Sequence, residues 1–220
     1  NWTLLPSTKD FAYVTKVVVR NESGNSVIYA GVVSGYYHGN QLSLPSDGLY
    51  RSADGGRSWQ QVLPDMPGSS MPYSPGDVKL GTDGRIYVGT MPNIDRNGGA
   101  VVLYSDAGTV GSWAAYTEIA ELIPNMGYLP LPGRVVIAPS PSNANVVYAA
   151  FAAGQHKVGK QPEYFGLFIF RSNDKGATWQ EAGIPEGDDQ WANLAWHAMT
   201  LAVDPNNPDV IYAGGLDVWK

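Results

Sequence analysis

The chain contains one segment twice, at residues 49–59 and 169–179. Both copies contain Ser-x-Asp-x-Gly-x-(Ser/Thr)-Trp, and both lie between apolar runs. Such self-similarity indicates a repeat architecture, in which each repeat builds one supersecondary unit. It constrains the fold more than any other feature, because every repeat must form the same local structure.

Each copy is typical of a strand, a tight turn and a second strand, since Asp and Gly tolerate the backbone angles of short hairpin connections. We expect the aspartate to accept hydrogen bonds from turn amides, the second glycine to take positive φ, and the tryptophan to begin the outgoing strand. A third copy at residues 103–113 keeps the serine, a glycine and the tryptophan but displaces the aspartate, so we interpret it as decayed. The residues with these predicted structural roles are Ser52, Asp54, Gly56, Trp59, Ser172, Asp174, Gly176 and Trp179.

A second repeated phrase, rich in β-branched residues and tyrosine, occurs at residues 27–31, 85–89, 146–150 and 210–214. Each phrase follows a turn cluster, and the apolar runs before those clusters lie at 16–19, 77–80, 134–137 and 199–203. These patterns predict a first and a second strand ahead of each hairpin. The repeating unit is therefore four antiparallel strands in roughly 50 to 70 residues, the size of a propeller blade.

The sequence thus predicts an all-β chain, a β-propeller of four-stranded antiparallel blades. About three full blades and parts of two more fit in the chain, and a propeller usually needs roughly four to eight blades to close. We therefore expect a partial propeller whose remaining blades belong to the same, longer polypeptide. The predicted boundaries are 1–15 for the end of a preceding blade, 16–64, 77–119 and 134–185 for the full blades, and 199–220 for the start of a further blade.

The repeated serine-aspartate segments resemble the Asp-box (BNR-type) repeat of sialidases, sortilin-like receptors, xyloglucan-hydrolysing endoglucanases and secreted bacterial propellers. Residues 202–220 resemble a phrase of large surface-displayed Asp-box proteins of the Bacteroidota type, and their Ala-Val-Asp-Pro start is similar to xyloglucanases. This resemblance implies that the box is a structural turn and that the protein is secreted or on the cell surface, associated with the outer membrane of a Gram-negative bacterium. The sialidase branch is disfavoured, because the chain has no Arg-Ile-Pro motif.

The amino-acid composition limits which kinds of partner and which kinds of chemistry the chain can support. A hydrophobic content of 44% allows a sizeable core, whereas a net charge of −6 without a run of Lys or Arg argues against nucleic acid and anionic membrane surfaces. No apolar run is long enough to insert across a bilayer. The absence of cysteine excludes disulfides, zinc-thiolate sites and thiol catalysis in these residues. We expect no cofactor.

One face of the predicted propeller receives every long loop: 34–45, 65–75, 91–98, 124–132, 154–166 and 186–197. Functional residues concentrate on loops held by a rigid scaffold. Aromatic rings with polar neighbours suit a carbohydrate or peptide site, although the rings could instead pack the loops onto the sheets. The candidate ligand-binding residues on these loops are Tyr36, Tyr37, His38, Tyr73, Tyr128, His156, Tyr164, Asp188, Asp189, Trp191, Trp196 and His197.

Two functions follow from these residues. The favoured one is an extracellular binding or adhesion module for a polysaccharide or a protein ligand, without chemistry of its own. The alternative is a fragment of a xyloglucanase-like glycoside hydrolase, which needs two carboxylates that flank the scissile bond. The adjacent pair Asp188 and Asp189 cannot do so alone, so a partner such as Asp47, Asp77 or Asp95 would be required. The three histidines are too widely spaced to form a local metal motif, so no metal site is predicted.

Overall fold

The structure is a computed structural model that describes residues 1–37, 40–42, 46–118, 133–155, 163–185, 191–192, 194–195 and 197–220. At residues 36–37, 40–42, 153–155 and 163–167 we use the backbone alone.

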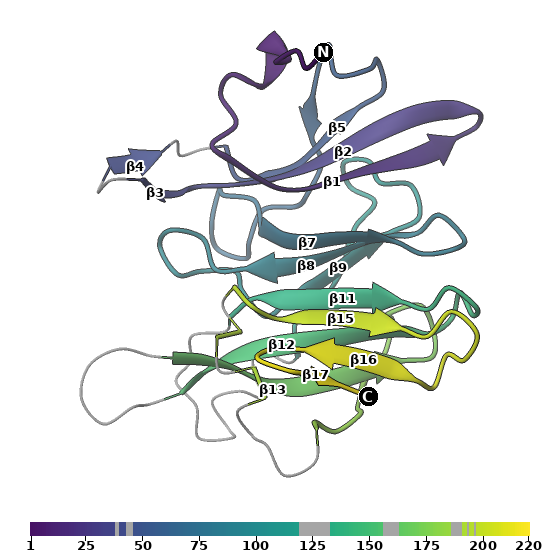
Figure 1. The fold of residues 1–220 in the computed structure, drawn as a ribbon. Coiled ribbons are helices and arrows are strands. Elements are labelled where there is room, and N and C mark those ends of the chain that lie inside the picture. The colour runs from purple at the N-terminus through teal and green to yellow at the C-terminus, as the bar shows by residue number, and fades with distance from the viewer. Residues whose placement is uncertain are drawn as a thin grey trace.

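Strands dominate the described residues and form consecutive antiparallel sheets (Figure 1). The first sheet has the order β1(Tyr13–Glu22), β2(Asn25–Val33), β5(Gly48–Ser52) and β6(Gln60–Gln61). The second consists of β7(Ser74–Leu80), β8(Ile86–Met91), β9(Val102–Ser105) and β10(Ala114–Tyr116), and the third of β11(Val135–Pro139), β12(Val147–Gln155), β13(Glu163–Ser172) and β14(Gln180–Glu181). The fourth contains β15(Thr200–Val203), β16(Ile211–Gly214) and β17(Val218–Trp219).

The sheets stack in chain order, and their first strands β1, β7, β11 and β15 lie next to one another (Figure 1). Each sheet is a meander in which a strand pairs with the one before it and the one after it. The first sheet lies apart from the fourth, so the described sheets do not close a ring (Figure 1). The predicted fold class, an all-β partial propeller of four-stranded antiparallel blades, is confirmed.

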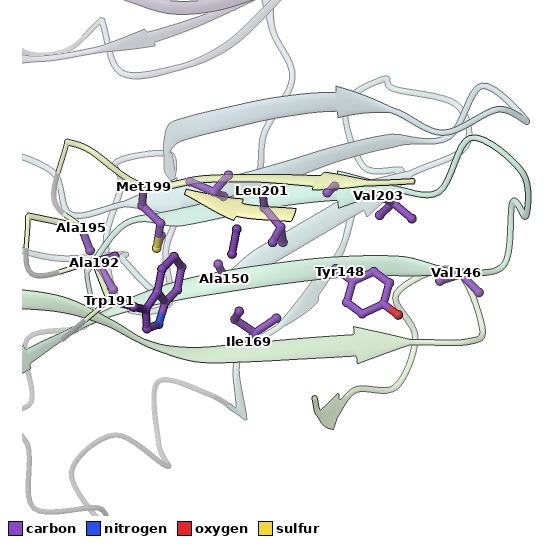
Figure 2. Packing of buried hydrophobic residues seen from close by; sticks show 14 residues of the cluster. Val146, Tyr148, Ala150, Ile169, Trp191, Ala192, Ala195, Met199, Leu201 and Val203 are labelled. Atoms are coloured by element: carbon purple, nitrogen blue, oxygen red, sulfur yellow. The ribbon is translucent and has the colours of Figure 1, made fainter. Parts of the chain in front are cut away.

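The hydrophobic core of the described residues lies between the sheets and forms three clusters. Successive residues of a strand point to opposite faces: Val135 and Ile137 of β11 pack toward the second sheet, whereas Val136 and Ala138 pack toward the fourth. Figure 2 shows the cluster between the third and fourth sheets, where Tyr148 and Leu201 are among the buried side chains. The second and third sheets are buried on both faces, which explains the nearly continuous apolar runs of their strands.

The two Ser-x-Asp-x-Gly-x-(Ser/Thr)-Trp segments, here called the Ser-Asp turns, join β5 to β6 and β13 to β14. In the first turn Ser52 Oγ donates to Asp54 Oδ1 over 2.8 Å and accepts from the amide of Gly56 over 2.9 Å. Ser58 donates to the same carboxylate through its amide at 3.0 Å and its hydroxyl at 2.6 Å. Gly56 has φ +84°, as expected for its predicted role.

The second Ser-Asp turn repeats this network. Ser172 Oγ donates to Asp174 Oδ1 over 2.7 Å and accepts from the Gly176 amide over 2.8 Å, and the Thr178 hydroxyl donates to Asp174 Oδ2 over 2.6 Å. Gly176 has φ +90°, and Trp179 is buried against the second sheet. The aspartates therefore organise the turns, as the sequence predicted.

The turn between β9 and β10, which we interpreted as decayed, keeps part of the network. The Gly108 amide donates to Ser105 Oγ over 2.8 Å, which is the serine–glycine contact of the Ser-Asp turns. Ser112 takes over from the displaced aspartate, because its hydroxyl lies 2.7 Å from Ser105 Oγ and accepts from the amide of Thr109 over 3.0 Å.

Two segments differ from the prediction. Residues 1–15 were predicted as the end of a preceding blade, because residues 2–6 resemble the strand that follows a Ser-Asp turn. The structure instead forms the 3-10 turn η1(Pro6–Thr8) in this segment and begins its first strand at Tyr13. No third strand among the described residues is available to pair with them. Instead, Ser7 Oγ accepts from Trp59 Nε1 over 3.1 Å, and the segment covers the first Ser-Asp turn. Within the predicted loop 34–45, β3(Gly35–Tyr37) and β4(Asn40–Leu42) form a short hairpin.

No helix in the described part of the chain combines the length and apolar character needed to cross a membrane.

Candidate functional site on the long-loop face

The strand order divides the connections between two faces. The first-to-second and third-to-fourth turns, which include the Ser-Asp turns, lie at one end of each sheet, because the strands alternate in direction. The second-to-third connections and the connections between sheets lie at the other end, here called the long-loop face. The inner strands β1, β7, β11 and β15 therefore begin at the long-loop face.

The predicted ligand-binding residues fall into three groups: residues outside the described part of the chain, residues with only the backbone described, and residues with the side chain described. Outside the described residues lie His38, Tyr128, His156, Asp188, Asp189 and Trp196. The backbone places Tyr36 and Tyr37 in β3 and Tyr164 in β13. Side chains are described for Tyr73, Trp191 and His197.

Two of these three side chains occupy core positions. Tyr73 is 4% exposed and packs in the cluster between the first and second sheets. Trp191 is 1% exposed and lies beside Met199 in the cluster between the third and fourth sheets (Figure 2). Both rings pack their loops onto the sheets, which is the alternative role that the sequence left open for them. His197 is exposed, and its carbonyl accepts a hydrogen bond from Arg134 Nη1 over 2.9 Å.

A cavity of about 500 Å³ opens on the long-loop face above the second sheet. One wall is the loop 66–69 from the connection between the first two sheets, and the other is the loop 97–99 between β8 and β9. Tyr73, Val101 and Thr117 complete the lining. Among the predicted residues whose side chains are described, Tyr73 alone lines it, and burial raises the pKa of its hydroxyl.

Both walls are held by local hydrogen bonds. The amide of Met66 donates to the carbonyl of Met71 over 2.9 Å, and the amide of Ser69 donates to the carbonyl of Met66 over 3.0 Å. In the second wall, Asn93 Oδ1 accepts from the amides of Asp95 and Asn97 over 3.0 and 2.9 Å. The cavity is therefore preformed rather than dependent on a ligand.

The chemistry of the cavity suits a neutral polar ligand. The hydroxyls of Ser69 and Thr117 and the amide of Asn97 can donate and accept hydrogen bonds. Met66 and Tyr73 supply apolar surface between them. Its described lining contains no carboxylate.

Two of the three carboxylates considered as partners for Asp188 and Asp189 are engaged elsewhere. Asp47 is 1% exposed and accepts a hydrogen bond from Ser74 Oγ over 2.6 Å. Asp77 is also 1% exposed and accepts from the amides of Val78 and Ile137, each over 3.1 Å. Asp95 is exposed at the end of the second wall. Buried, hydrogen-bonded carboxylates hold strands together and do not present a pair across an open groove.

A cluster of basic residues around Asp77 was missed by the sequence analysis. Lys16 Nζ and Lys79 Nζ lie 3.6 and 3.9 Å from Asp77 Oδ1. Burial lowers the pKa of Arg134, and the nearby charge of Asp77 raises it in opposition. The available signal was a charged residue near the start of three otherwise apolar first strands, at positions 16, 77 and 134.

A second cavity of about 440 Å³ lies beside β17 and is lined mostly by apolar groups, including Ile184, Ile211 and Trp219. In the first and third sheets the position next to the third strand is occupied by β6 and β14. The lining of this cavity comes from the third and fourth sheets, and it includes none of the predicted ligand-binding residues that the structure describes.

Comparison with solved structures shows propeller proteins with the same fold. A GH74 xyloglucanase from Xanthomonas campestris superposes with a TM-score of 0.50 at 20% identity, covering 88% of this chain and 25% of that one. An ancestral GH74 enzyme gives a TM-score of 0.58 at 19% identity, covering 97% of this chain and 25% of that one. YCF48 bound to D1 peptide is a weaker match, with a TM-score of 0.47 at 14% identity over 93% of this chain and 49% of that one.

The chain spans a quarter of the length of the two GH74 proteins, and identities this low show the fold alone. No protein-family model matches the chain, and comparison with curated proteins finds no relative.

Proposed function

We propose that this propeller segment is an extracellular binding module that holds a polysaccharide on its long-loop face, without catalysing its hydrolysis. The observation that carries the proposal is the preformed cavity between loops 66–69 and 97–99. Its hydroxyls, side-chain amide and apolar surface match the alternating polar and apolar surface of a sugar.

The structural neighbours support the choice of carbohydrate over protein. Two of them are GH74 proteins, one of which is described as a xyloglucanase. The binding role is favoured over hydrolysis because Asp47 and Asp77 are buried and hydrogen-bonded. The extracellular location rests on the resemblance of the Ser-Asp turns to secreted propellers.

Binding to plant and microbial polysaccharides can be measured by affinity gel electrophoresis, with xyloglucan as the first member of the panel. Asn97→Trp fills the cavity and keeps the backbone hydrogen bonds of Asn97, so it should weaken binding by about tenfold or more. Asn206→Trp is the matched control, because Asn206 is exposed at the opposite end of the sheets, in the turn between β15 and β16.

Binding that is lost in Asn97→Trp and retained in Asn206→Trp supports the proposal. Three results would overturn it: no binding to any polysaccharide, equal loss in the two variants, or the release of reducing ends from a bound polysaccharide.

A further inference from the structure

The inner strands of three sheets bring basic side chains to one buried carboxylate. Lys16 comes from β1, Lys79 from β7, and Arg134 immediately precedes β11. Asp77 of β7 lies between them and is almost completely buried. We call Lys16, Lys79 and Arg134 the axial cations.

Neither lysine donates a hydrogen bond to Asp77. Its oxygens already accept the amides of Val78 and Ile137. The lysine nitrogens lie 3.6 and 3.9 Å from Oδ1, beyond the usual range of an N–H···O hydrogen bond. Each ammonium carries three donors, and each lysine side chain is 39% exposed. Within the described residues, these donors therefore face solvent.

Arg134 is more enclosed. One arm of its guanidinium, Nη1, donates to the carbonyl of His197. That contact fixes the side chain at the junction of the second, third and fourth sheets. The fork geometry of a guanidinium suits the paired oxygens of an oxyanion.

The local charge balance is positive. Lys16 and Lys79 lie within 4 Å of Asp77, and Arg134 is close enough for the charge of Asp77 to raise its pKa. Around this one carboxylate the three cations leave an excess of positive charge, whereas the whole chain carries −6. A local excess of positive charge on a protein whose net charge is negative attracts anions to that one place.

The axial cations are adjacent to the face of the proposed function. Lys16 and Arg134 stand near the first residues of β1 and β11, and these strands begin at the long-loop face. Lys79 lies near the end of β7, but its ammonium reaches back to Asp77, nearer the start of the strand. A chain-like ligand held by the loops would thus meet these charges where it reaches the inner strands.

We infer that the axial cations bind an oxyanion carried on a polysaccharide, either the carboxylate of a uronic acid or a sulfate ester. This inference rests on the proposed function and specifies the class of its ligand: an acidic polysaccharide. Binding should then weaken as salt is added, because these lysines are partly exposed and added ions screen their charges.

The test compares polygalacturonate, dextran sulfate and neutral dextran and xyloglucan in affinity gel electrophoresis at low and high salt. Lys16→Met and Lys79→Met should each weaken binding to an acidic polysaccharide by about fivefold and leave binding to neutral polysaccharides unchanged. Lys16→Arg keeps the charge and should retain binding. Lys9→Met is the control, because Lys9 is exposed near the N-terminal turn. Thermal unfolding checks each variant, and if one lysine variant does not fold, the other carries the test.

A preference for polygalacturonate identifies a carboxylate and a preference for dextran sulfate a sulfate ester, and both support the inference. The inference is overturned if acidic polysaccharides bind no better than neutral ones, or if both lysine variants behave like Lys9→Met. Binding to neutral polysaccharides alone overturns this inference and leaves the proposed function standing. Failure to bind any polysaccharide overturns both.

Discussion

Ser172 Oγ donates a hydrogen bond to Asp174 Oδ1 over 2.7 Å at the centre of the second Ser-Asp turn. The same carboxylate accepts the amide and the hydroxyl of Thr178 over 2.8 and 2.6 Å. One exposed aspartate thus accepts three hydrogen bonds, and these bonds hold the turn between β13 and β14.

Asp174→Ala should lower the free energy of unfolding by about 1 to 2 kcal/mol, because Ser172 and Thr178 lose their common acceptor. Urea denaturation followed by tryptophan fluorescence measures the change. Asp10→Ala is the matched control at an exposed aspartate near the N-terminus and should change the value by less than about 0.5 kcal/mol. Equal effects of the two substitutions would contradict the role assigned to Asp174.

Stability should fall at acid pH. Desolvation raises the pKa of Asp174, but the hydrogen bonds from Thr178 and Ser172 outweigh it, so that the pKa lies below its usual value. The pKa of Asp106 is also lowered, chiefly by its hydrogen bonds with Arg85. A carboxyl with a lowered pKa in the folded state stabilises it fully above the unfolded pKa, near pH 4, and loses this effect as the pH falls toward the folded pKa.

Melting temperatures between about pH 6 and pH 2 should therefore be nearly constant above pH 4 and decrease below it. Asp174→Asn should show a shallower decrease than the unmodified protein, since one of the responsible groups no longer titrates. An identical pH profile in the variant would count against this explanation.

Arg20 joins the first two sheets. Its side chain is nearly buried and donates to the carbonyls of Gly84 and Asp106 in the second sheet over 3.2 and 2.8 Å. Arg20→Met should cost about 3 kcal/mol, because these carbonyls and Glu22 lose a charged partner in a poorly solvated place. Arg57→Met, at an exposed position in the first Ser-Asp turn, is the control. Chemical denaturation of both variants makes the comparison, and a loss below about 1 kcal/mol for Arg20→Met would refute the bridging role.

Much of the fold was predictable because its determinants are local. The serine, aspartate and glycine of each Ser-Asp turn act within five residues of one another, so their spacing alone identifies the hairpin. The four repeated β-branched phrases likewise identify β2, β8, β12 and β16, because each follows a turn cluster. Residues 2–6 show the limit of this reasoning: a strand pattern yields a strand only where an unpaired strand lies beside it.

The candidate site was less predictable because its determinants are not local. Tyr73 and Trp191 are aromatic residues on long loops, as ligand-contacting residues often are. Tertiary packing nevertheless places both in the core. The axial cations are separated by dozens of residues in sequence and meet only because β1, β7 and β11 lie next to one another. The sequence shows no run of basic residues, so their proximity follows from the stacking of the sheets.

Two glycines in the turn between β9 and β10 provide a matched pair for testing the packing between the first and second sheets. Gly108 and Gly111 have φ values of +68° and +77°, so replacing either by alanine costs about 1 kcal/mol for the left-handed backbone. At Gly111 an added Cβ meets nothing within 4 Å, whereas at Gly108 it meets the Tyr29 hydroxyl and lies 2.7 Å from Ile86 Cδ1. Gly108→Ala should therefore cost about 1 to 3 kcal/mol more than Gly111→Ala in urea denaturation. Equal costs would mean that the turn is free to move away from Tyr29, and that the first two sheets are packed less tightly at this end than the structure shows.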